Sequence, residues 1–366
     1  MKINKLFYQN YRNLEDNECT FSENVNIIYG GNGQGKTNML ESLWLLCGAK
    51  SFRGNKDNEL IKFGHDKAII KAEFFAEERT QDVKIIIENR RKITLNGIDL
   101  PSANKLAGKI LCVVFIPEHL SLIKRSAQGR RLFIDSAICQ LYPKYINTIK
   151  KYQTIINQRN TLLKDIRTNK DARETLFIWD ENLSNYASEI YKARSRYIKL
   201  IREHCIKIYD GISKGSEQLD IYYEPDISCD NETEYKNIYL NILKESLEED
   251  IRIGYTTRGP HRDDLISLLN NKNARSFASQ GQQRSIVLSL KLSEAEIIKE
   301  ITGEAPFILF DDVMSELDSD RREYLLSKIN NWQIFITCCD IDDYNYDENK
   351  KIFNLKNGQV KEIKNI

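Results

Sequence analysis

The sequence lacks the features of a membrane-spanning or secreted protein. None of its apolar runs approaches the ~20 residues that a helix needs to cross a bilayer, and Met1 to Lys5 show no apolar core of a signal peptide. Its eight cysteines include no Cys-x-x-Cys pair, and only Cys338 and Cys339 are neighbours, which argues against a zinc site and against a disulfide framework. We therefore expect a cytoplasmic protein with reduced thiols.

Net charge is also nearly absent. Lysine and arginine number 54 against 53 aspartates and glutamates, a net charge of +1, so the charge of the whole chain indicates no class of partner. Charged residues make up 29% and hydrophobic residues 41%, the usual balance of a soluble protein. The 366 residues are enough for two domains, each with a sizeable core.

A glycine-rich stretch between a predicted strand and a predicted helix carries the strongest signal. Val25 to Tyr29 is rich in β-formers, and apolar residues from Met39 onward follow helical spacing. Glycines let the backbone take positive φ, and the N–H groups of such a loop and of the helix start point at phosphate oxygens. A turn that only starts a helix is the alternative, but this order of residues is the phosphate-binding loop pattern. The loop comprises Gly30, Gly31, Asn32, Gly33, Gln34, Gly35, Lys36 and Thr37.

Three residues in or near this loop are candidates for nucleotide chemistry. Lys36 can reach the β- and γ-phosphates, and the Thr37 hydroxyl is placed to ligate Mg²⁺. Arg12 lies just upstream and could contact phosphate or base, although a solvated surface arginine is the better interpretation of that residue alone.

Two later stretches point to the same chemistry. Ser279-Gln280-Gly281-Gln282 opens a predicted helix, and with Ser279 as cap it presents backbone N–H groups to a second anion. Phe307 to Phe310 is an apolar strand that ends in Asp311 and Asp312. A strand that delivers acids at its carboxyl end, beside a phosphate loop, is what a Mg-nucleotide site requires. The alternative is a strand that happens to end in a polar turn.

The regions between these motifs predict a sheet and a helical hairpin. Residues 69–116 are rich in β-formers and contain the hairpin-turn dipeptide Asn96-Gly97, so we expect an antiparallel sheet there, with Ile110 to Ile116 as a buried strand. Apolar residues then repeat with heptad-like spacing over 145–163 and 179–197, separated by polar residues. This pattern predicts a short antiparallel helical hairpin.

The predicted hairpin is basic. Residues 144–207 include 14 lysines and arginines against 7 acids. A solvated helix face is the usual explanation for such a charge run, and a DNA or RNA surface is the alternative. The candidate nucleic-acid contacts are Lys192, Arg194 and Arg196 in the hairpin, and Arg130 and Arg131 before it.

Together these motifs resemble the ABC-type ATPases of DNA repair and chromosome maintenance, related to the SMC/Rad50 group, and within them the RecF family. The resemblance runs over almost the full length and rests on Gly33–Asn38, Ser51–Arg53, Arg130–Arg131, Gly259–Leu265, Ser279–Arg284 and Asp311–Asp318. It implies an α/β ABC-type ATPase head, with a mixed sheet around the phosphate-loop helix and an antiparallel β subdomain, and a mainly helical second lobe that contains the hairpin. We expect residues 1–121 and 256–366 to form the two parts of the ATPase lobe, and residues 122–255 to form the helical lobe.

The resemblance also implies roles for the site residues. By this resemblance, Lys36 contacts phosphate, Thr37 ligates Mg²⁺ and Asp311 holds that ion through water. Asp312 stands where relatives carry a catalytic glutamate that polarises the attacking water. Because Asp312 is one methylene shorter, we expect slow hydrolysis, that of a weak DNA-stimulated ATPase used as a switch.

The stretch Ser279 to Gln282 resembles the signature motif, which in this superfamily caps the γ-phosphate of ATP held by the other protomer. Ser315 and Asp318 match the D-loop that crosses the same interface. Two incomplete sites facing each other need two chains, so the resemblance implies an ATP-dependent homodimer. No histidine follows Thr337, where many relatives contact the γ-phosphate.

The function implied by the resemblance is an ATP-dependent DNA-binding switch of recombinational repair and replication restart. ATP would close the dimer on double-stranded or gapped DNA, and hydrolysis would release it, with RecR and RecO cooperating to load RecA. A transport-type ATPase subunit is the alternative, but the basic hairpin and the stretch Pro260 to Asp264 argue against it. An ATPase-linked nuclease is disfavoured because fewer than 30 residues follow Thr337.

Overall fold

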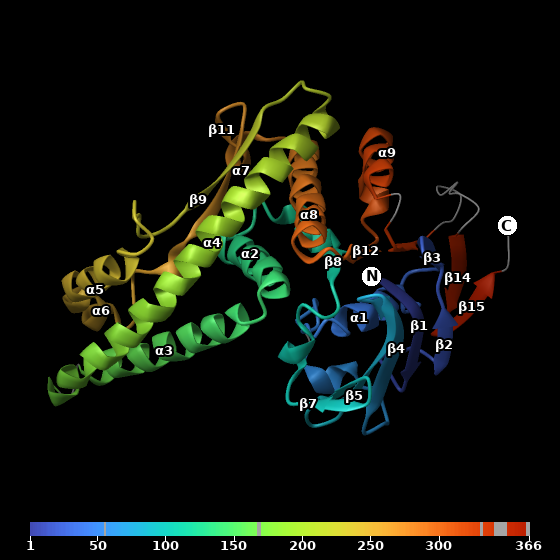
Figure 1. The fold of residues 1–366 in the computed structure, drawn as a ribbon, viewed down its shortest axis with the longest axis horizontal. Coiled ribbons are helices and arrows are strands. Elements are labelled where there is room, and N and C mark those ends of the chain that lie inside the picture. The colour runs from blue at the N-terminus through green and yellow to red at the C-terminus, as the bar shows by residue number, and fades with distance from the viewer. Residues whose placement is uncertain (55, 167–169, 330–331, 340–349, 364–366) are drawn as a thin grey trace. The chain divides into compact units, whose positions relative to one another are not determined.

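The computed structural model describes residues 1–54, 56–166, 170–329, 332–339 and 350–363. The chain divides into two compact units (Figure 1). The first comprises Met1–Ser121, Gly211–Gly215 and Arg284–Ile366, and the second comprises Leu122–Asp210 and Ser216–Gln283. Residues 256–283, expected above in the ATPase lobe, fall in the second unit. The division into functional domains stays a prediction.

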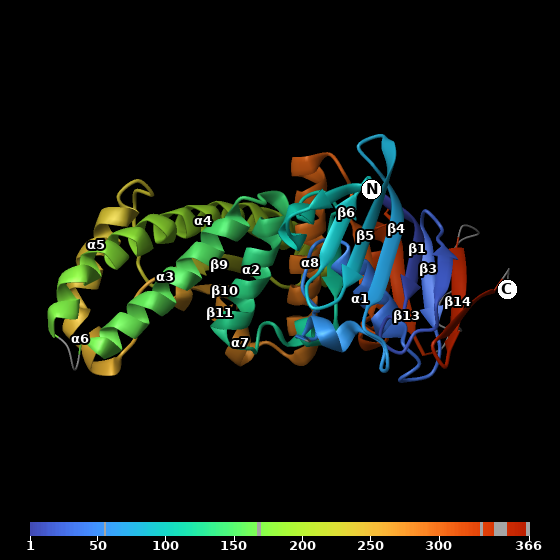
Figure 2. The same cartoon turned by 90° about the horizontal axis from the view of Figure 1, so that it is seen from below.

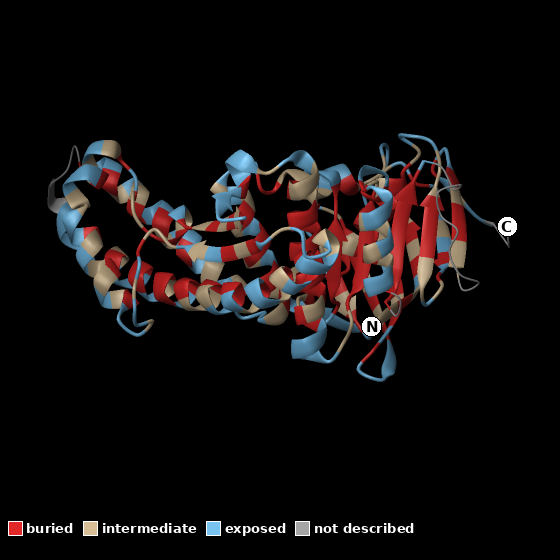
Figure 3. Ribbon diagram, turned by 90° about the horizontal axis from the view of Figure 1, so that it is seen from above, coloured by how far each residue is buried: buried red, intermediate tan, exposed pale blue. Residues whose placement is uncertain are grey.

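A mixed sheet forms the centre of the first unit. Its strand order is β15 (Gln359–Ile363), β14 (Lys350–Lys356), β3 (Val25–Tyr29), β13 (Ile334–Cys338), β12 (Phe307–Asp311) and β8 (Cys112–Phe115). Neighbouring strands are parallel except for β14 and β15. Every residue of β8, β12 and β13 is buried, and Figure 3 colours the central strands of this unit red. Continuous apolar runs suit parallel strands that are covered on both faces.

The second sheet of this unit is antiparallel. Its order is β2 (Asn17–Thr20), β1 (Lys2–Gln9), β4 (Ala68–Ala76), β5 (Arg79–Ile87), β6 (Lys92–Leu95) and β7 (Ile98–Leu100). The expected turn joins β6 to β7, with Asn96 at φ 51° and Gly97 at φ 75°, as a type I′ hairpin requires. The predicted strand Ile110 to Ile116 does not belong to this sheet. Its central residues, Cys112–Phe115, form β8 in the mixed sheet, where strands are buried on both faces rather than on alternate ones.

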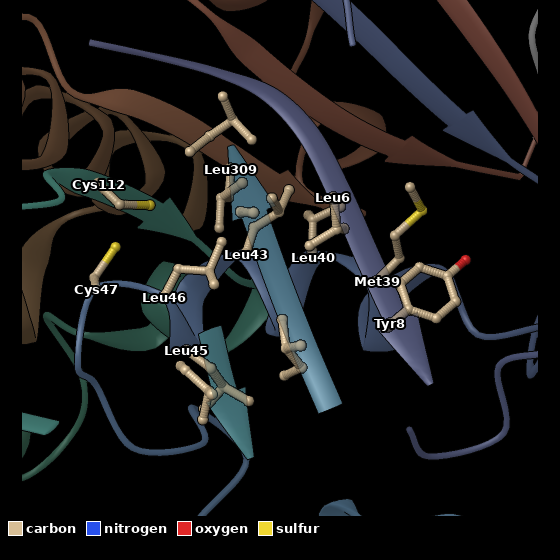
Figure 4. Close-up of a cluster of buried hydrophobic side chains, with 14 of the residues drawn as sticks. Leu6, Tyr8, Met39, Leu40, Leu43, Leu45, Leu46, Cys47, Cys112 and Leu309 are labelled. Atoms are coloured by element: carbon tan, nitrogen blue, oxygen red, sulfur yellow. The ribbon is translucent and has the colours of Figure 1, made fainter. Parts of the chain in front are cut away.

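Helix α1 (Lys36–Leu45) is packed in the core of the first unit. Figure 4 shows its Leu40 and Leu43 close to Leu6 of β1 and Leu309 of β12, and one hydrophobic cluster joins all four. Because both sheets contribute to this cluster, α1 is buried around most of its surface, a property of helices inside a core. The packing holds the first turn of α1 at the carboxyl end of β3. The unit also contains α9 (Ser319–Lys328).

The second unit is mainly helical. Its helices are α2 (Ala127–Leu141), α3 (Tyr145–Asp165), α4 (Leu176–Ser213), α5 (Tyr235–Glu245), α6 (Leu247–Ile253) and α7 (Ala274–Phe277), and α8 (Gln280–Thr302) begins in it. A small antiparallel sheet has the order β11 (Lys272–Asn273), β10 (Asp264–Leu269) and β9 (Leu219–Glu224). Short 3₁₀ helices occur in the chain at Asp57–Leu60, Ala103–Leu106, Pro117–Ser121, Lys170–Thr175, Pro260–Arg262 and Met314–Glu316. No helix in the described ranges has the length and apolar character needed to span a membrane.

Helices α3 and α4 form the expected antiparallel hairpin, and Figure 1 and Figure 2 both draw them side by side. Thr148 Oγ1 donates to Glu189 at 2.7 Å, and Arg159 Nε donates to Asp180 at 2.7 Å. Going along α3 from Thr148 to Arg159, the bonded residue on α4 moves back from Glu189 to Asp180. The two helices therefore run in opposite directions. α4 is longer than the predicted second run, because buried apolar residues continue beyond it, from Ile198 to Tyr209.

A buried charge network holds the hairpin to the segment before β10. The Arg194 guanidinium donates to both carboxylate oxygens of Asp135, at 2.9 and 2.8 Å, to Asp263 at 2.8 Å and to the carbonyl of Pro260 at 2.6 Å. Asp263 is 1% exposed and also accepts the Tyr223 hydroxyl. Such charges are tolerated inside a protein because each has an opposite partner and further hydrogen bonds.

His261 extends this network in its neutral form. Its Nε2 lies 3.0 Å from the carbonyl of Thr256, which can only accept, so Nε2 carries the proton. Nδ1 then accepts the Tyr152 hydroxyl at 2.8 Å. Burial lowers the pKa of His261 to about 4, which keeps the ring uncharged at neutral pH. The segment from Gly259 to Asp264 therefore organises the core of the second unit.

We expect Arg194→Ala to destabilise the protein by about 3–5 kcal/mol, because it leaves Asp135 and Asp263 with uncompensated buried charge. The matched control is Arg196→Ala, two residues along the same helix, whose side chain is 73% exposed and pairs with Glu232 at the surface. Exposed pairs contribute little to stability. Urea denaturation followed by circular dichroism measures both variants. Equal midpoints for the two would contradict the structural role of Arg194.

Candidate nucleotide-binding site

The loop between β3 and α1 needs glycine at two positions. A Cβ at Gly30 would lie 2.2 Å from the carbonyl oxygen of Leu355 in β14. Gly35 has a φ of 110°, and a Cβ there would lie 2.7 Å from the Leu14 side chain. Because Gly35 is also the residue before α1, no side chain caps that helix. The first N–H groups of α1 are therefore left to bind an anion.

The Lys36 side chain folds back over the loop. Its Nζ donates to the carbonyl oxygens of Gly30 at 2.7 Å and Gly31 at 3.3 Å, and lies 3.4 Å from Cys339 Sγ. Cys339 Sγ in turn lies 3.1 Å from Asn32 Oδ1. An ammonium binds a charged phosphate oxygen more strongly than a neutral carbonyl oxygen, so a phosphate in the loop would be the better partner for Lys36.

Asp311, the last residue of β12, lies beside the start of α1. Its Oδ1 accepts hydrogen bonds from the hydroxyls of Thr37 and Thr337, each at 2.9 Å. Burial raises the pKa of the Asp311 carboxyl, although both hydrogen bonds lower it. A carboxylate next to a hydroxyl supplies the hard oxygen donors that Mg²⁺ prefers, and a nucleotide-associated Mg²⁺ takes further ligands from phosphate and water. The residues present therefore fit a Mg²⁺ ion.

Asp312 turns the chain away from β12. Its φ is 52°, in the left-handed region, which costs a non-glycine residue about 1 kcal/mol or more. Two hydrogen bonds hold this turn: the Asp312 N–H donates to Thr337 Oγ1 at 2.9 Å, and the Asp312 carbonyl accepts from Ser315 Oγ at 3.0 Å. The two neighbouring acids therefore have different backbone conformations.

One pocket of about 200 Å³ brings the loop and Asp312 together. Its lining consists of Gly31, Asn32, Gly33, Gly35, Lys36, Thr37, Asn38, Arg53 and Asp312. Arg53 was in a family-like motif but had no predicted role, since no local pattern links it to the loop. Its Nη1 donates to Asn38 Oδ1 at 2.9 Å, which adds a second cation to the pocket. Gln34 instead accepts from the N–H of Asn357, in the turn after β14.

Arg12 is held by a buried carboxylate rather than by the pocket. Its Nε and Nη2 donate to Glu41 Oε2 at 3.0 and 2.7 Å, and its Nη1 donates to the carbonyl of Glu59 at 3.3 Å. Glu41 is fully buried and also accepts the Tyr11 hydroxyl at 3.1 Å. Its guanidinium compensates the buried charge of Glu41. A contact of Arg12 with nucleotide stays a prediction.

The expected helix cap at Ser279 is present in the second unit. The Gln282 N–H donates to Ser279 Oγ at 3.2 Å, and the Ser279 N–H donates to Gln282 Oε1 at 2.7 Å, which is a reciprocal capping box. Gln282 Nε2 also donates to Glu217 at 2.5 Å. The Gln282 N–H, one of the groups expected to face an anion, thus already has an acceptor within the chain. Ser279 and Gln280 are exposed.

The predicted D-loop residues make contacts within the first unit. Ser315 donates to Asp312, as described above. Asp318 caps α9 by accepting the N–H of Arg321 at 3.0 Å, and it pairs with the Arg321 guanidinium. Any role of these residues across a dimer interface stays a prediction.

Comparison with known proteins points to one family. The family described as RecF/RecN/SMC N terminal domain matches residues 2–361. The DNA replication and repair protein RecF of Lachnoclostridium phytofermentans is 38% identical over 364 residues, which are 98% of this chain and 99% of that protein. RecF of Acetivibrio thermocellus is 40% identical over 345 residues, or 93% and 94% of the two chains. This chain belongs to the RecF family.

Solved structures agree with this assignment. The structure described as the recombination mediator protein RecF-ATP in the RecFOR pathway has a TM-score of 0.92 at 35% identity, covering 99% of this chain and 98% of that one. An SMC head bound to the C-winged helix domain of ScpA has a TM-score of 0.57 at 16% identity, covering 99% and 97%, and shows the fold alone. The predicted ABC-type ATPase head with a helical lobe is therefore confirmed.

Burial separates the basic residues that were predicted to contact DNA in this RecF-family chain. Arg130 and Arg194 are each 4% exposed. Arg130 donates to both oxygens of Asp264, at 2.6 and 2.7 Å, and Arg194 is bound as described above. Reaching a DNA phosphate would break these buried ion pairs at a cost of several kcal/mol. We therefore withdraw Arg130 and Arg194 from the DNA surface.

The remaining basic residues differ in exposure. Arg131 is partly buried and donates to the carbonyl of Asp263 at 2.6 Å, and its pKa is lowered by burial and by nearby Arg194. Lys192 is partly exposed, whereas Arg196 and Lys199 are exposed. Residues four and three apart share one face of a helix, so Lys192, Arg196 and Lys199 form a basic stripe along α4. Lys199 was not among the predicted contacts.

We expect ATP to slow the alkylation of Cys339 by iodoacetamide several-fold, because its thiol lies beside Lys36 and phosphate would occupy that place. Peptide mass spectrometry measures the rate. Cys229, partly exposed in the second unit, is the internal control, since the other cysteines except Cys139 and Cys339 are buried. Lys36→Ala should abolish the protection. Equal labelling of Cys339 with and without saturating ATP would place the nucleotide elsewhere.

Proposed function

We propose that this protein is an ATP-dependent DNA-binding switch of recombinational DNA repair and replication restart. The observation that carries the proposal is the hydrogen bond from Thr37, which lines the pocket together with Lys36 and Asp312, to the neighbouring Asp311. A phosphate-binding lysine, a pair of oxygen donors for a divalent ion and a second acid are the parts that phosphoryl transfer from ATP requires. Membership of the RecF family supplies the biological setting.

In the proposed reaction, Lys36 leaves the carbonyls of Gly30 and Gly31 to bind the β- and γ-phosphates. Thr37 and Asp311 would hold Mg²⁺, and the ion would supply positive charge to the phosphate oxygens. Arg53 adds positive charge on the side of Asn38. Asp312 orients the attacking water and accepts its proton. An aspartate reaches less far than a glutamate, so the expected turnover is slow.

The proposed active form is a homodimer. Ser279 and Gln280 are exposed at the start of α8, and the Ser279 hydroxyl together with the positive end of the helix can bind an anion brought by another molecule. In the proposal, this anion is the γ-phosphate of ATP bound to a second copy of the chain. ATP then joins the two copies, and its hydrolysis separates them.

The proposed DNA surface includes the stripe of Lys192, Arg196 and Lys199 on α4. Arg196 and Lys199 are exposed and Lys192 is partly exposed, and such cations bind backbone phosphates, which carry no sequence information. The expected binding is therefore independent of sequence. Double-stranded or gapped DNA is the proposed ligand. A relative is described as a recombination mediator in the RecFOR pathway, which supports RecR and RecO as partners in loading RecA.

The mass of the protein in solution tests the switch. With ATP and Mg²⁺ we expect a dimer, and with ADP or without nucleotide a monomer, by light scattering with and without duplex DNA. Lys36→Ala should weaken ATP binding by about 10–100-fold, the value of a missing charge-assisted bond, and so abolish dimer formation. In the Ser279→Arg variant, ATP should still slow the alkylation of Cys339, but the protein should stay monomeric. A wild-type protein that stays monomeric with ATP would refute the proposal.

The salt dependence of DNA binding tests the α4 stripe. Replacing Lys192, Arg196 and Lys199 by alanine should reduce the log–log salt slope by about 0.9 for each phosphate that the variant no longer neutralises, equally for unrelated sequences. Arg252→Ala, an exposed arginine of α6 in the same unit, is the control. Fluorescence anisotropy between low and physiological salt gives the slopes. An unchanged slope in the triple variant would remove the stripe from the DNA surface.

A further inference from the structure

We propose that Thr337 is a positioning residue for ATP hydrolysis, which holds Asp311 and Asp312 in their separate orientations through one hydroxyl group. The proposal rests on the ATPase function proposed above. Thr337 lies in β13, outside the phosphate loop, the strand that ends in the acids and the signature stretch. Nothing in the sequence pattern gave it a role.

The sheet register places Thr337 beside the acids. In the parallel pairing of β12 with β13, Thr337 is the partner of Asp311. Thr337 is 1% exposed, so its hydroxyl must be satisfied by protein atoms. Three polar atoms lie within reach of Oγ1: Asp311 Oδ1 at 2.9 Å, the Asp312 nitrogen at 2.9 Å and the Phe310 carbonyl oxygen at 3.4 Å.

The direction of each hydrogen bond follows from the groups present. The Asp312 nitrogen can only donate, so Thr337 Oγ1 accepts there. The single proton of the hydroxyl then goes to Asp311 Oδ1, because that oxygen is 2.9 Å away and the Phe310 carbonyl oxygen is 3.4 Å away. One hydroxyl thus connects the carboxylate of one acid to the backbone of the next. If either Asp311 or Asp312 moves, it loses its hydrogen bond to Thr337 Oγ1.

This link matters most for Asp312. Its left-handed φ of 52° is a conformation that a non-glycine residue keeps only when its surroundings enforce it. The hydrogen bond from its N–H to Thr337 is one of the two that hold the turn, and it is the one formed with another strand. Without it the turn can relax toward a common backbone conformation. The Asp312 carboxylate would then move relative to Lys36 and Thr37 in the pocket.

Thr337 also retains a donor for Asp311 when nucleotide is present. In the structure, Asp311 Oδ1 accepts from both Thr37 and Thr337. The Thr37 hydroxyl is a proposed Mg²⁺ ligand and would be drawn away from the carboxylate. Thr337 is not a proposed Mg²⁺ ligand, so its hydroxyl can keep donating to the Asp311 carboxylate and hold it in its orientation. Partners of this kind, behind the groups that touch substrate or metal, typically change activity by about 10–100-fold when removed.

Thr337→Val tests the proposal, since it keeps the shape of the side chain and removes the hydroxyl. We expect kcat for ATP to fall by about 10–100-fold, with KM nearly unchanged. ATP-dependent dimer formation and the protection of Cys339 by ATP should both be unaffected. Thr337→Ser, which keeps the hydroxyl, should restore most of kcat. Thermal denaturation without nucleotide checks that the variants are folded, and Thr337→Ala replaces the valine variant if valine is not tolerated.

A second measurement separates positioning from a general structural effect. In an Asp312→Asn background, Thr337→Val should lower the residual turnover by much less than it does in the wild type, because both changes affect the same step. Full kcat in Thr337→Val, or an equal loss in both backgrounds, would overturn the role of Thr337 and leave the ATPase proposal intact. Absence of ATP turnover by the wild type, with and without DNA, would refute both.

Discussion

The parallel pairing of β3, β13 and β12 is the constraint on which the rest of the site depends. Its register sets Cys338 beside Tyr29 and Thr337 beside Asp311. These strands are buried on both faces, so polar groups can be accommodated only where the strands leave the sheet. The phosphate loop, the two acids and the Thr337 hydroxyl therefore meet at one edge, although the chain brings them from opposite ends of the sequence.

Burial of charge is the corresponding constraint in the second unit. Arg194 and Arg130 are placed inside, where each compensates an aspartate of the segment before and at the start of β10. The high positive charge of the hairpin sequence therefore overstates the charge that its surface presents. The part of that surface proposed to bind DNA is the stripe of Lys192, Arg196 and Lys199 on one side of α4. Rigidity of the hairpin and its proposed binding of DNA thus depend on different arginines of the same helix.

The sequence predicted those parts of the site that short patterns specify. The glycine loop, the acids at the end of an apolar strand and the cap at Ser279 each depend on residues within a few positions of one another, and the structure contains all three. Arg53 and Thr337 were missed because their importance arises from contacts with distant segments. The ion pair between Arg12 and Glu41 was missed for the same reason, since Glu41 lies on a helix that no local pattern connects to Arg12.

Amino-acid order by itself determined the phosphate loop with its flanking strand and helix, the Asn96-Gly97 hairpin, the helical hairpin and the family, because periodicity, glycine placement and motif spacing are local properties. Only the tertiary structure decided that Ile110 to Ile116 contributes β8 to the mixed sheet, which arginines are buried, and that one threonine hydroxyl connects both acids. The physical reason is that strand pairing, desolvation of charge and the sharing of a hydrogen bond depend on which distant segments come into contact.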